Sequence, residues 1–185
     1  MKFQASIPLL GAALIAGSAH AADTLPAGTL ITGSLSGASS TLLGLDHGYA
    51  AEPGSNVTAL AASDIEYLSG DFALAFDFFT DGTLQVWNNS DSRSLANYSV
   101  SFSFAGASLG GITLGDISGL NGGTVSVQLL DAHTVSLTFG NLSFADDFGS
   151  FTTQISAAVV PEPTSYALLV AGLGLLALRR ARRSA

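Results

Sequence analysis

Carboxylates are the residues of this sequence that could perform acid–base chemistry. Two close pairs, Asp64/Glu66 and Asp146/Asp147, have the residue types that a glycoside hydrolase uses, because that reaction needs two carboxyl groups roughly 5 to 9 Å apart. A secreted hydrolase would require two such acids to converge in one cleft. Acids in solvated loops are far commoner than catalytic pairs, so we interpret both pairs as loop acids and predict that the chain is not an enzyme.

Residues that bind metals are equally sparse. His47 and His133 each stand alone in a predicted loop, and the chain contains no cysteine, so the residues that a zinc site combines do not occur together. Calcium prefers carboxylate oxygens, which several aspartates on or beside predicted turns could supply. These calcium candidates are Asp77, Asp81, Asp146 and Asp147. They do not follow the spaced Asp-x-Asp-x-Asp-Gly pattern of a calcium-binding loop, and we expect no cofactor.

Three aromatic residues suggest a different kind of site. Trp87, Tyr49 and Tyr98 could form a platform on which sugar rings stack, with neighbouring acids accepting hydroxyl protons. The alternative is that these residues only pack, since Tyr98 lies in a strictly alternating segment. An exposed Trp87 beside a second aromatic on one sheet face would favour carbohydrate binding, whereas burial of all three would favour a structural role.

The charge of the central segment excludes one class of partner. Between residues 22 and 160, thirteen acidic residues face a single basic one, Arg93, which gives a net charge of −12. Such a surface repels phosphate groups, so we predict no nucleic-acid binding. The same segment has no lysine, which removes lysine nucleophiles and Schiff bases.

The clearest predicted element is a hairpin that would position several of these residues. From Asp71 to Phe79 every second residue is apolar, which predicts a strand with one buried face; the residues of that face are Phe72, Leu74, Phe76 and Phe78. A two-residue Asp81-Gly82 loop would place Phe78 opposite Gln85. A three-residue loop, residues 80–82, with Gly82 in the left-handed conformation, instead pairs Phe78 with Leu84 and Phe76 with Val86. We favour the three-residue loop.

The rest of the central segment also predicts short strands. Expected strands lie at residues 28–35, 42–45, 83–87, 96–104, 112–114, 125–129, 135–139 and 150–159, while residues 57–68 fit either a helix or a broken strand. The segment at 96–104 alternates strictly between apolar and polar residues, which is typical of a strand with one solvated face. Seven to nine strands with frequent turns predict an all-β fold, an antiparallel β-sandwich of jelly-roll-like type.

The N-terminus predicts export. Lys2 supplies a positive charge, residues 7–16 are apolar, and Ala19-His20-Ala21 gives the small-x-small pattern that signal peptidase cleaves. We therefore expect a helical signal peptide at residues 1–21, read by the Sec machinery and removed after Ala21. The expected extracellular domain is residues 22–159.

The C-terminus has three parts in a fixed order. Pro161 and Pro163 lack N–H donors and favour an extended strip; an apolar segment, residues 164–178, follows; and a cluster of arginines ends it, namely Arg179, Arg180, Arg182 and Arg183. A helix over residues 164–178 would reach about 22 Å, short of the roughly 30 Å hydrocarbon core. Snorkelling arginines relieve that mismatch, and they keep this end in the cytoplasm, with the domain outside.

This order of Pro-Glu-Pro strip, apolar helix and arginine cluster closely resembles the PEP-CTERM sorting signal of Gram-negative bacteria. The residues that carry the resemblance to the motif are Val160, Pro161, Glu162 and Pro163, and the sorting signal spans residues 160–185. The resemblance implies recognition by an exosortase, which removes the tail after the helix has held the chain in the inner membrane. It also implies a place at the cell surface or in the extracellular matrix, associated with exopolysaccharide and biofilm.

The sequence thus predicts an exported, exosortase-processed protein with a non-catalytic structural or adhesive β-domain. The alternative is a carbohydrate-binding module that contacts exopolysaccharide.

Overall fold

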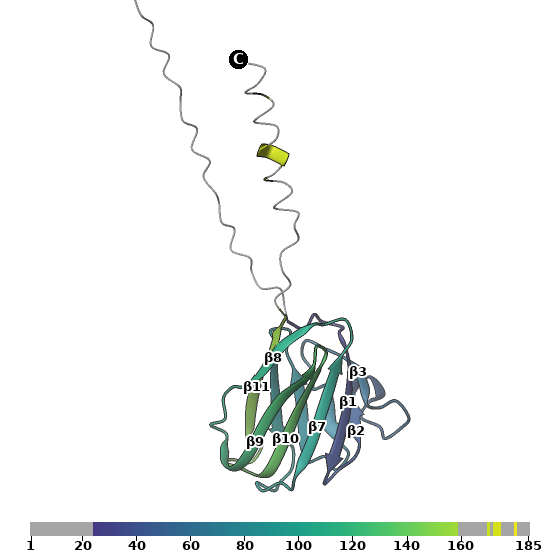
Figure 1. Cartoon of the computed structure of the whole chain (residues 1–185). Helices are drawn as coiled ribbons and strands as arrows, with labels where there is room; N and C mark the ends of the chain where they lie inside the picture. The colour runs from purple at the N-terminus through teal and green to yellow at the C-terminus, as the bar shows by residue number, and fades with distance from the viewer. Residues whose placement is uncertain (1–23, 159–169, 171, 175–179, 181–185) are drawn as a thin grey trace, which may run out of the picture.

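The computed structural model describes residues 24–158, 170, 172–174 and 180, and residues 24–158 form two β-sheets that pack face to face (Figure 1). The five-stranded sheet has the order β3 (Val57–Ala59), β1 (Leu30–Gly37), β7 (Tyr98–Phe104), β10 (Thr134–Phe144) and β9 (Leu120–Asp131). The six-stranded sheet has the order β2 (Leu42–Gly44), β4 (Tyr67–Ser69), β5 (Leu74–Phe78), β6 (Thr83–Asn88), β11 (Ser150–Ala157) and β8 (Leu109–Leu114). All the pairings are antiparallel, which confirms the predicted all-β sandwich.

Aromatic rings fill the space between the sheets. Phe102 of β7 lies 5.3 Å from Phe76 and 4.9 Å from Phe78 of β5, ring centroid to ring centroid, in edge-on geometry. A second contact of this kind joins Phe139 of β10 to Phe151 of β11 at 5.7 Å. Edge-to-face pairs add to the stabilisation that burial alone provides, so one continuous core holds both sheets together.

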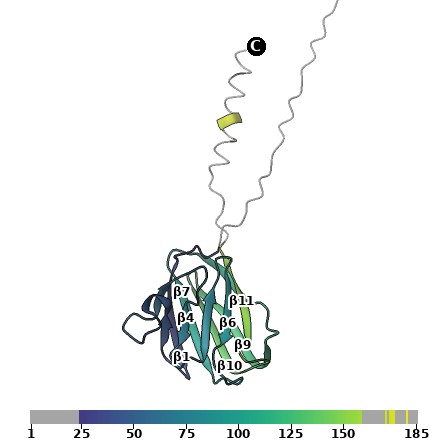
Figure 2. The ribbon, with the colours of Figure 1, turned by 180° about the vertical axis from the view of Figure 1, so that it is seen from behind.

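The last two strands are inserted between earlier ones. In Figures 1 and 2, β10 lies between β7 and β9, while β11 lies between β6 and β8. This interleaving is of the Greek-key kind from which jelly rolls are built. It places one edge strand of each sheet, β8 and β9, on the same side of the sandwich.

The predicted hairpin register is confirmed. Phe78 pairs with Leu84 and Phe76 with Val86, as a three-residue loop requires. Gly82 has a φ of +88°, and a Cβ there would lie 2.1 Å from the backbone oxygen of Ile155. Only glycine fits this turn without strain.

Three positions that were predicted to face the core are exposed. Phe72 is 51% exposed. The spacing of Phe144 and Phe148 around two aspartates predicts that both rings point inward, but Phe148 is 60% exposed. Phe72 and Phe148 both have a φ of +59°, and this left-handed backbone ends the alternation of faces that a strand would have continued. In the third case, Ala96 is exposed, while its neighbour Leu95 is buried.

Element boundaries shift modestly from the predicted ones. The first strand starts at Leu30 and continues to Gly37, through part of the expected turn. The ambiguous segment 57–68 is a broken strand, with β3 at its start and β4 beginning at Tyr67. The described residues contain eleven strands rather than seven to nine, because the ambiguous segment contributes β3 and β4, two strands of three residues each.

Both predicted terminal segments fall largely beyond the described residues. Residues 1–21, including Ala19 and Ala21, lie outside them, as do Val160, Pro161, Glu162 and Pro163. In the segment 164–178, residues 170 and 172–174 are helical. No helix that the structure describes is long and apolar enough to cross a membrane.

Candidate functional site

The outward face of the six-stranded sheet carries Trp87. Pairing across β2, β4, β5 and β6 aligns Leu43 with Leu68, Leu68 with Ala75, and Ala75 with Trp87. These residues alternate with the core-facing ones, so the row lies on the outer side of the sheet. The indole Nε1 of Trp87 is buried and has no hydrogen-bond partner among the described residues. This apolar row ends at a half-buried tryptophan.

A polar row runs beside Trp87 on the same face. Asp77 of β5 pairs with Gln85 of β6, and Gln85 pairs with Thr152 of β11. Gln85 Nε2 also donates to the Ser150 hydroxyl at 2.9 Å. The three-residue turn at 80–82 sets this register, and it therefore brings an indole, an amide and a carboxylate onto one surface. These three groups can stack on a sugar ring and hydrogen-bond its hydroxyls.

Glu66 is a fully buried carboxylate close to this polar row. Its Oε2 accepts the Phe78 N–H at 2.7 Å and its Oε1 accepts the Ala61 N–H at 2.8 Å. Burial raises the pKa of Glu66 to about 7, although the two N–H donors act in the opposite direction. Glu66 thus joins the β3–β4 connection to β5.

Acidic neighbours and a tyrosine surround Glu66. Burial raises the pKa of Asp77, and the charge of Asp64 raises it further. The pKa of Tyr49 is also raised, by burial and then by Asp64, Glu66 and Asp77. The Tyr49 hydroxyl donates to the backbone oxygen of Ile65. The sequence did not indicate that Glu66 and Asp77 would meet, because their proximity depends on the pairing of β4 with β5.

Tyr98 does not belong to an aromatic platform. Its side chain is 4% exposed and faces the core from the five-stranded sheet, whereas Trp87 faces outward from the other sheet. The Tyr98 hydroxyl donates to Asp71 Oδ2 at 2.5 Å. Burial acts to raise the pKa of Asp71, but hydrogen bonds from Ser69, Tyr98 and the Ala73 N–H outweigh it and lower that pKa. Tyr98 therefore ties one sheet to the β4–β5 loop of the other.

The predicted carboxylate pairs serve other contacts. Glu66 bonds to backbone N–H groups, while Asp64 is exposed. Asp147 Oδ1 lies 2.8 Å from Arg93 Nε, and this pairing lowers the pKa of the exposed Asp147. Asp146 is also exposed.

Histidines and the remaining calcium candidate are dispersed. His47 Nδ1 lies 2.6 Å from Glu52 Oε1, and His133 Nδ1 lies 2.5 Å from the Ala107 oxygen. Asp81 accepts the Thr83 N–H at 2.8 Å within the hairpin turn. In the part of the chain that the structure describes, no three His, Asp or Glu residues group as they would around a metal ion.

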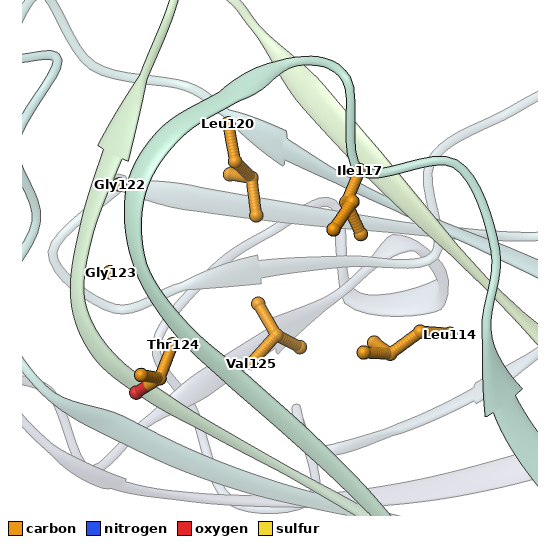
Figure 3. Close-up of a pocket in the computed structure, with 7 residues that line it drawn as sticks. All are labelled: Leu114, Ile117, Leu120, Gly122, Gly123, Thr124 and Val125. Carbon is orange, nitrogen blue, oxygen red and sulfur yellow. The ribbon is translucent and has the colours of Figure 1, made fainter.

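A cavity of about 390 Å³ opens on the side where β8 and β9 lie (Figure 3). Leu114, Ile117, Leu120 and Val125 point into it from the end of β8, the following loop and β9, and Gly122 and Gly123 line its wall. Its lining is mostly apolar, Thr124 also lines it, and none of the lining residues is charged. The cavity thus lies between the end of β8 and the first half of β9.

Fold and charge define an acidic all-β sandwich that precedes a separate C-terminal tail. Residues 159–183 of that tail match the family model described as the PEP-CTERM protein-sorting motif. The match confirms the resemblance predicted from the Pro-Glu-Pro strip and the arginine cluster, and it covers the tail alone. The motif directs exported proteins of Gram-negative bacteria to an exosortase. No curated protein and no solved structure matches the chain.

Proposed function

We propose that this protein is an exported surface or matrix protein whose β-sandwich has a structural or adhesive role and whose tail is removed by an exosortase. The match of residues 159–183 to the sorting motif carries the proposal. On this proposal, signal peptidase and the Sec machinery act on residues 1–21, and the tail helix then holds the chain in the inner membrane. The released domain is associated with exopolysaccharide or biofilm and has no catalytic role.

The described domain suits release as an independent unit. Its buried apolar residues form one core cluster contributed by both sheets, from Leu25 to Ile155. Because that core closes before Ala158, loss of the tail leaves the buried apolar surface of the sandwich intact. A net charge of −12 favours solubility outside the cell.

The test compares tail processing in Gram-negative cells with and without an exosortase. The C-terminus of the chain is determined by intact mass spectrometry in membrane and medium fractions. We expect a shortened, released chain only when the exosortase is present, and a retained full tail in the Pro161→Ala/Glu162→Ala variant. Glu52→Ala/Pro53→Ala alters the same residue types outside the tail and should process normally. Equal release of all forms without an exosortase would overturn the proposal.

Carbohydrate binding is the second candidate function, and it rests on the outer face of the six-stranded sheet, where Trp87 is half-buried and so meets only part of the exposure expected of a sugar platform. Trp87, Gln85 and Asp77 lie there on adjacent strands. We expect Trp87→Ala to reduce retention on neutral polysaccharide, because it removes the aromatic ring on which a sugar would stack. Leu30→Ala removes an exposed apolar side chain from the other sheet and should leave retention unchanged. A glycan array that detects no ligand for the unmodified protein would eliminate this candidate.

A further inference from the structure

The sandwich has four sheet edges, and they differ in how well they can accept another strand. The edges at β2 and β3 are three residues long. The edge at β8 has six residues, including Gly110 and Gly111, and its pairing with β11 shifts register near Ser156. Short and irregular edges resist the addition of a further strand. The fourth edge, β9, has twelve residues.

Residues 120–130 of β9 lack two of the features that usually protect an edge, charge and proline. Residues 120–130 contain no charged residue and no proline, although both commonly block edge-to-edge pairing. Within the described part of the chain, β9 has a strand partner on one side only, β10. Val125, Val127 and Leu129 pack against the core from β9 but remain partly exposed. The edge is therefore long, neutral and incompletely covered.

The straight part of β9 is centred on Ser126. Gly123 has a φ of +92°, which bends the strand on one side. On the other side, the pairing with β10 shifts register between Leu129 and Asp131, and Leu130 at that bulge is 52% exposed. Thr124 to Gln128 keep a regular register with β10. Another strand can extend the sheet along these five residues.

We propose that β9 pairs antiparallel with β9 of a second copy of this chain, with Ser126 opposite Ser126 at the two-fold axis. The two five-stranded sheets then form one continuous sheet. Identical edges pair in this way because an antiparallel ladder is self-complementary under two-fold rotation. This assembly is independent of tail processing and of carbohydrate binding.

A second copy is the occupant whose side chains fit this edge. In the proposed register, Val125 of each copy lies opposite Val127 of the other, on the core side of the sheet, so both lose exposed apolar surface. The same register places the exposed Leu130 opposite Gly122, beside the apolar cavity that Gly122 and Gly123 line. No charged residue lies between Leu120 and Leu130, so no like charges oppose each other along this part of the ladder.

Single cysteines test the register, because the chain has none of its own. Residues directly opposite in an antiparallel pair have Cα atoms about 4.5 to 5.5 Å apart, within disulfide range. In the full chain purified in detergent and treated with a mild oxidant, Ser126→Cys should form a cross-linked dimer. Thr124→Cys and Gln128→Cys should each cross-link poorly alone and efficiently when mixed. Ser34→Cys is the control, because Ser34 lies on β1 and on the same face of the five-stranded sheet as Ser126.

A charge substitution tests the contact without a cross-link. Ser126→Glu places two carboxylates opposite each other at the axis, whereas Ser34→Glu adds the same charge to the same sheet face three strands away. We expect Ser126→Glu to weaken pairing of the mixed Thr124→Cys and Gln128→Cys chains by about tenfold. Ser34→Glu should leave the cross-linking rate unchanged. Circular dichroism melting of both variants verifies that each is folded.

Three outcomes would overturn the proposal. Ser126→Cys could cross-link no better than Ser34→Cys. The mixed chains could cross-link no faster than either chain alone. Ser126→Cys in cell envelopes could join a different protein and not itself, in which case β9 binds another partner. If the tail is processed normally and any of these results is found, the proposed function stands and the β9 dimer is excluded. If processing fails but cross-linking is efficient, the dimer stands and the proposed function is excluded.

Discussion

The Glu66 carboxylate accepts a hydrogen bond from the backbone N–H of Phe78, 2.7 Å away, with no exposed surface. This contact joins the segment before β4 to the last residue of β5, at the start of the hairpin turn. It places a buried titratable group at the point where the turn that carries Asp81 and Gly82 begins.

The stability of the domain should fall as the pH rises through this group. The pKa of Glu66 is about 7 in the folded chain, above its ordinary value, so the folded state holds a proton that the unfolded state releases. The contribution of this proton to the free energy of unfolding is therefore complete below about pH 4.5. About 3 kcal/mol of that free energy is lost as the pH rises to 7. Asp77, whose pKa is also raised, acts in the same direction.

Glu66→Gln should flatten this pH dependence, because an amide does not titrate. It should also lower stability at pH 5, since the amide NH₂ cannot accept the second backbone N–H. Urea unfolding at pH 5, 6, 7 and 8 measures both effects. Asp91→Asn, which removes an exposed acid, should keep the wild-type slope. An unchanged slope in Glu66→Gln would show that another group controls the pH dependence.

Tyr98→Phe should weaken the link between the two sheets. It deletes the donor to Asp71, a hydrogen bond to a charged acceptor, and we expect a loss of about 1 to 2 kcal/mol at pH 7. The pKa of Asp71 is lowered in the folded state, so the loss should shrink as the pH falls through that pKa and Asp71 becomes protonated. Tyr49→Phe removes a hydroxyl that donates to a neutral carbonyl and should cost less. Equal losses at pH 7 and pH 3 would contradict the role of Asp71.

Gly82→Ala should be much more damaging than Gly106→Ala. Both glycines have positive φ values, +88° and +80°, but a Cβ on Gly106 would meet nothing within 4 Å. Gly106→Ala should therefore cost about 1 kcal/mol, the strain of the backbone alone. Gly82→Ala adds a clash with the Ile155 oxygen and should cost at least about 2 kcal/mol more. Thermal unfolding measured by circular dichroism distinguishes the two, and similar melting temperatures would refute the tight turn.

Thr153→Val should stabilise the domain, whereas Thr58→Val should destabilise it. Both threonines are buried. Thr153 Oγ1 has no hydrogen-bond partner among the described residues, while Thr58 Oγ1 accepts the Asp46 N–H at 3.1 Å. Replacing an unpaired buried hydroxyl by a methyl group should add about 1 kcal/mol, and removing a paired one should subtract a similar amount. The chemical denaturation midpoint should rise for Thr153→Val and fall for Thr58→Val. A loss of stability in Thr153→Val would show that the Thr153 hydroxyl is paired.

Alternation and turn chemistry made much of the fold predictable. The register of Phe76 with Val86 follows from Gly82, because only a three-residue loop keeps both apolar faces on one side. Phe72 was mispredicted because its left-handed backbone is not a conformation that phenylalanine prefers, so the sequence carries no local sign of it. Glu66 resembled a loop acid because its burial depends on contacts with Ala61 and Phe78, which tertiary packing creates. The sorting tail could be predicted because its signal consists of residues that are consecutive in the sequence and does not depend on tertiary contacts.

Both ends of the described domain emerge beside the same turn: the Leu25 N–H donates to Thr80, and the Ile155 N–H donates to Gly82 (Figure 1). An attachment that follows Ala158 would therefore orient the molecule with this pole toward its anchor. Two copies paired antiparallel through Ser126 would have their anchoring poles on opposite sides. Two copies anchored side by side in one membrane could not form this dimer. The dimer would therefore link copies anchored in two facing membranes, or would form only after both copies had been released.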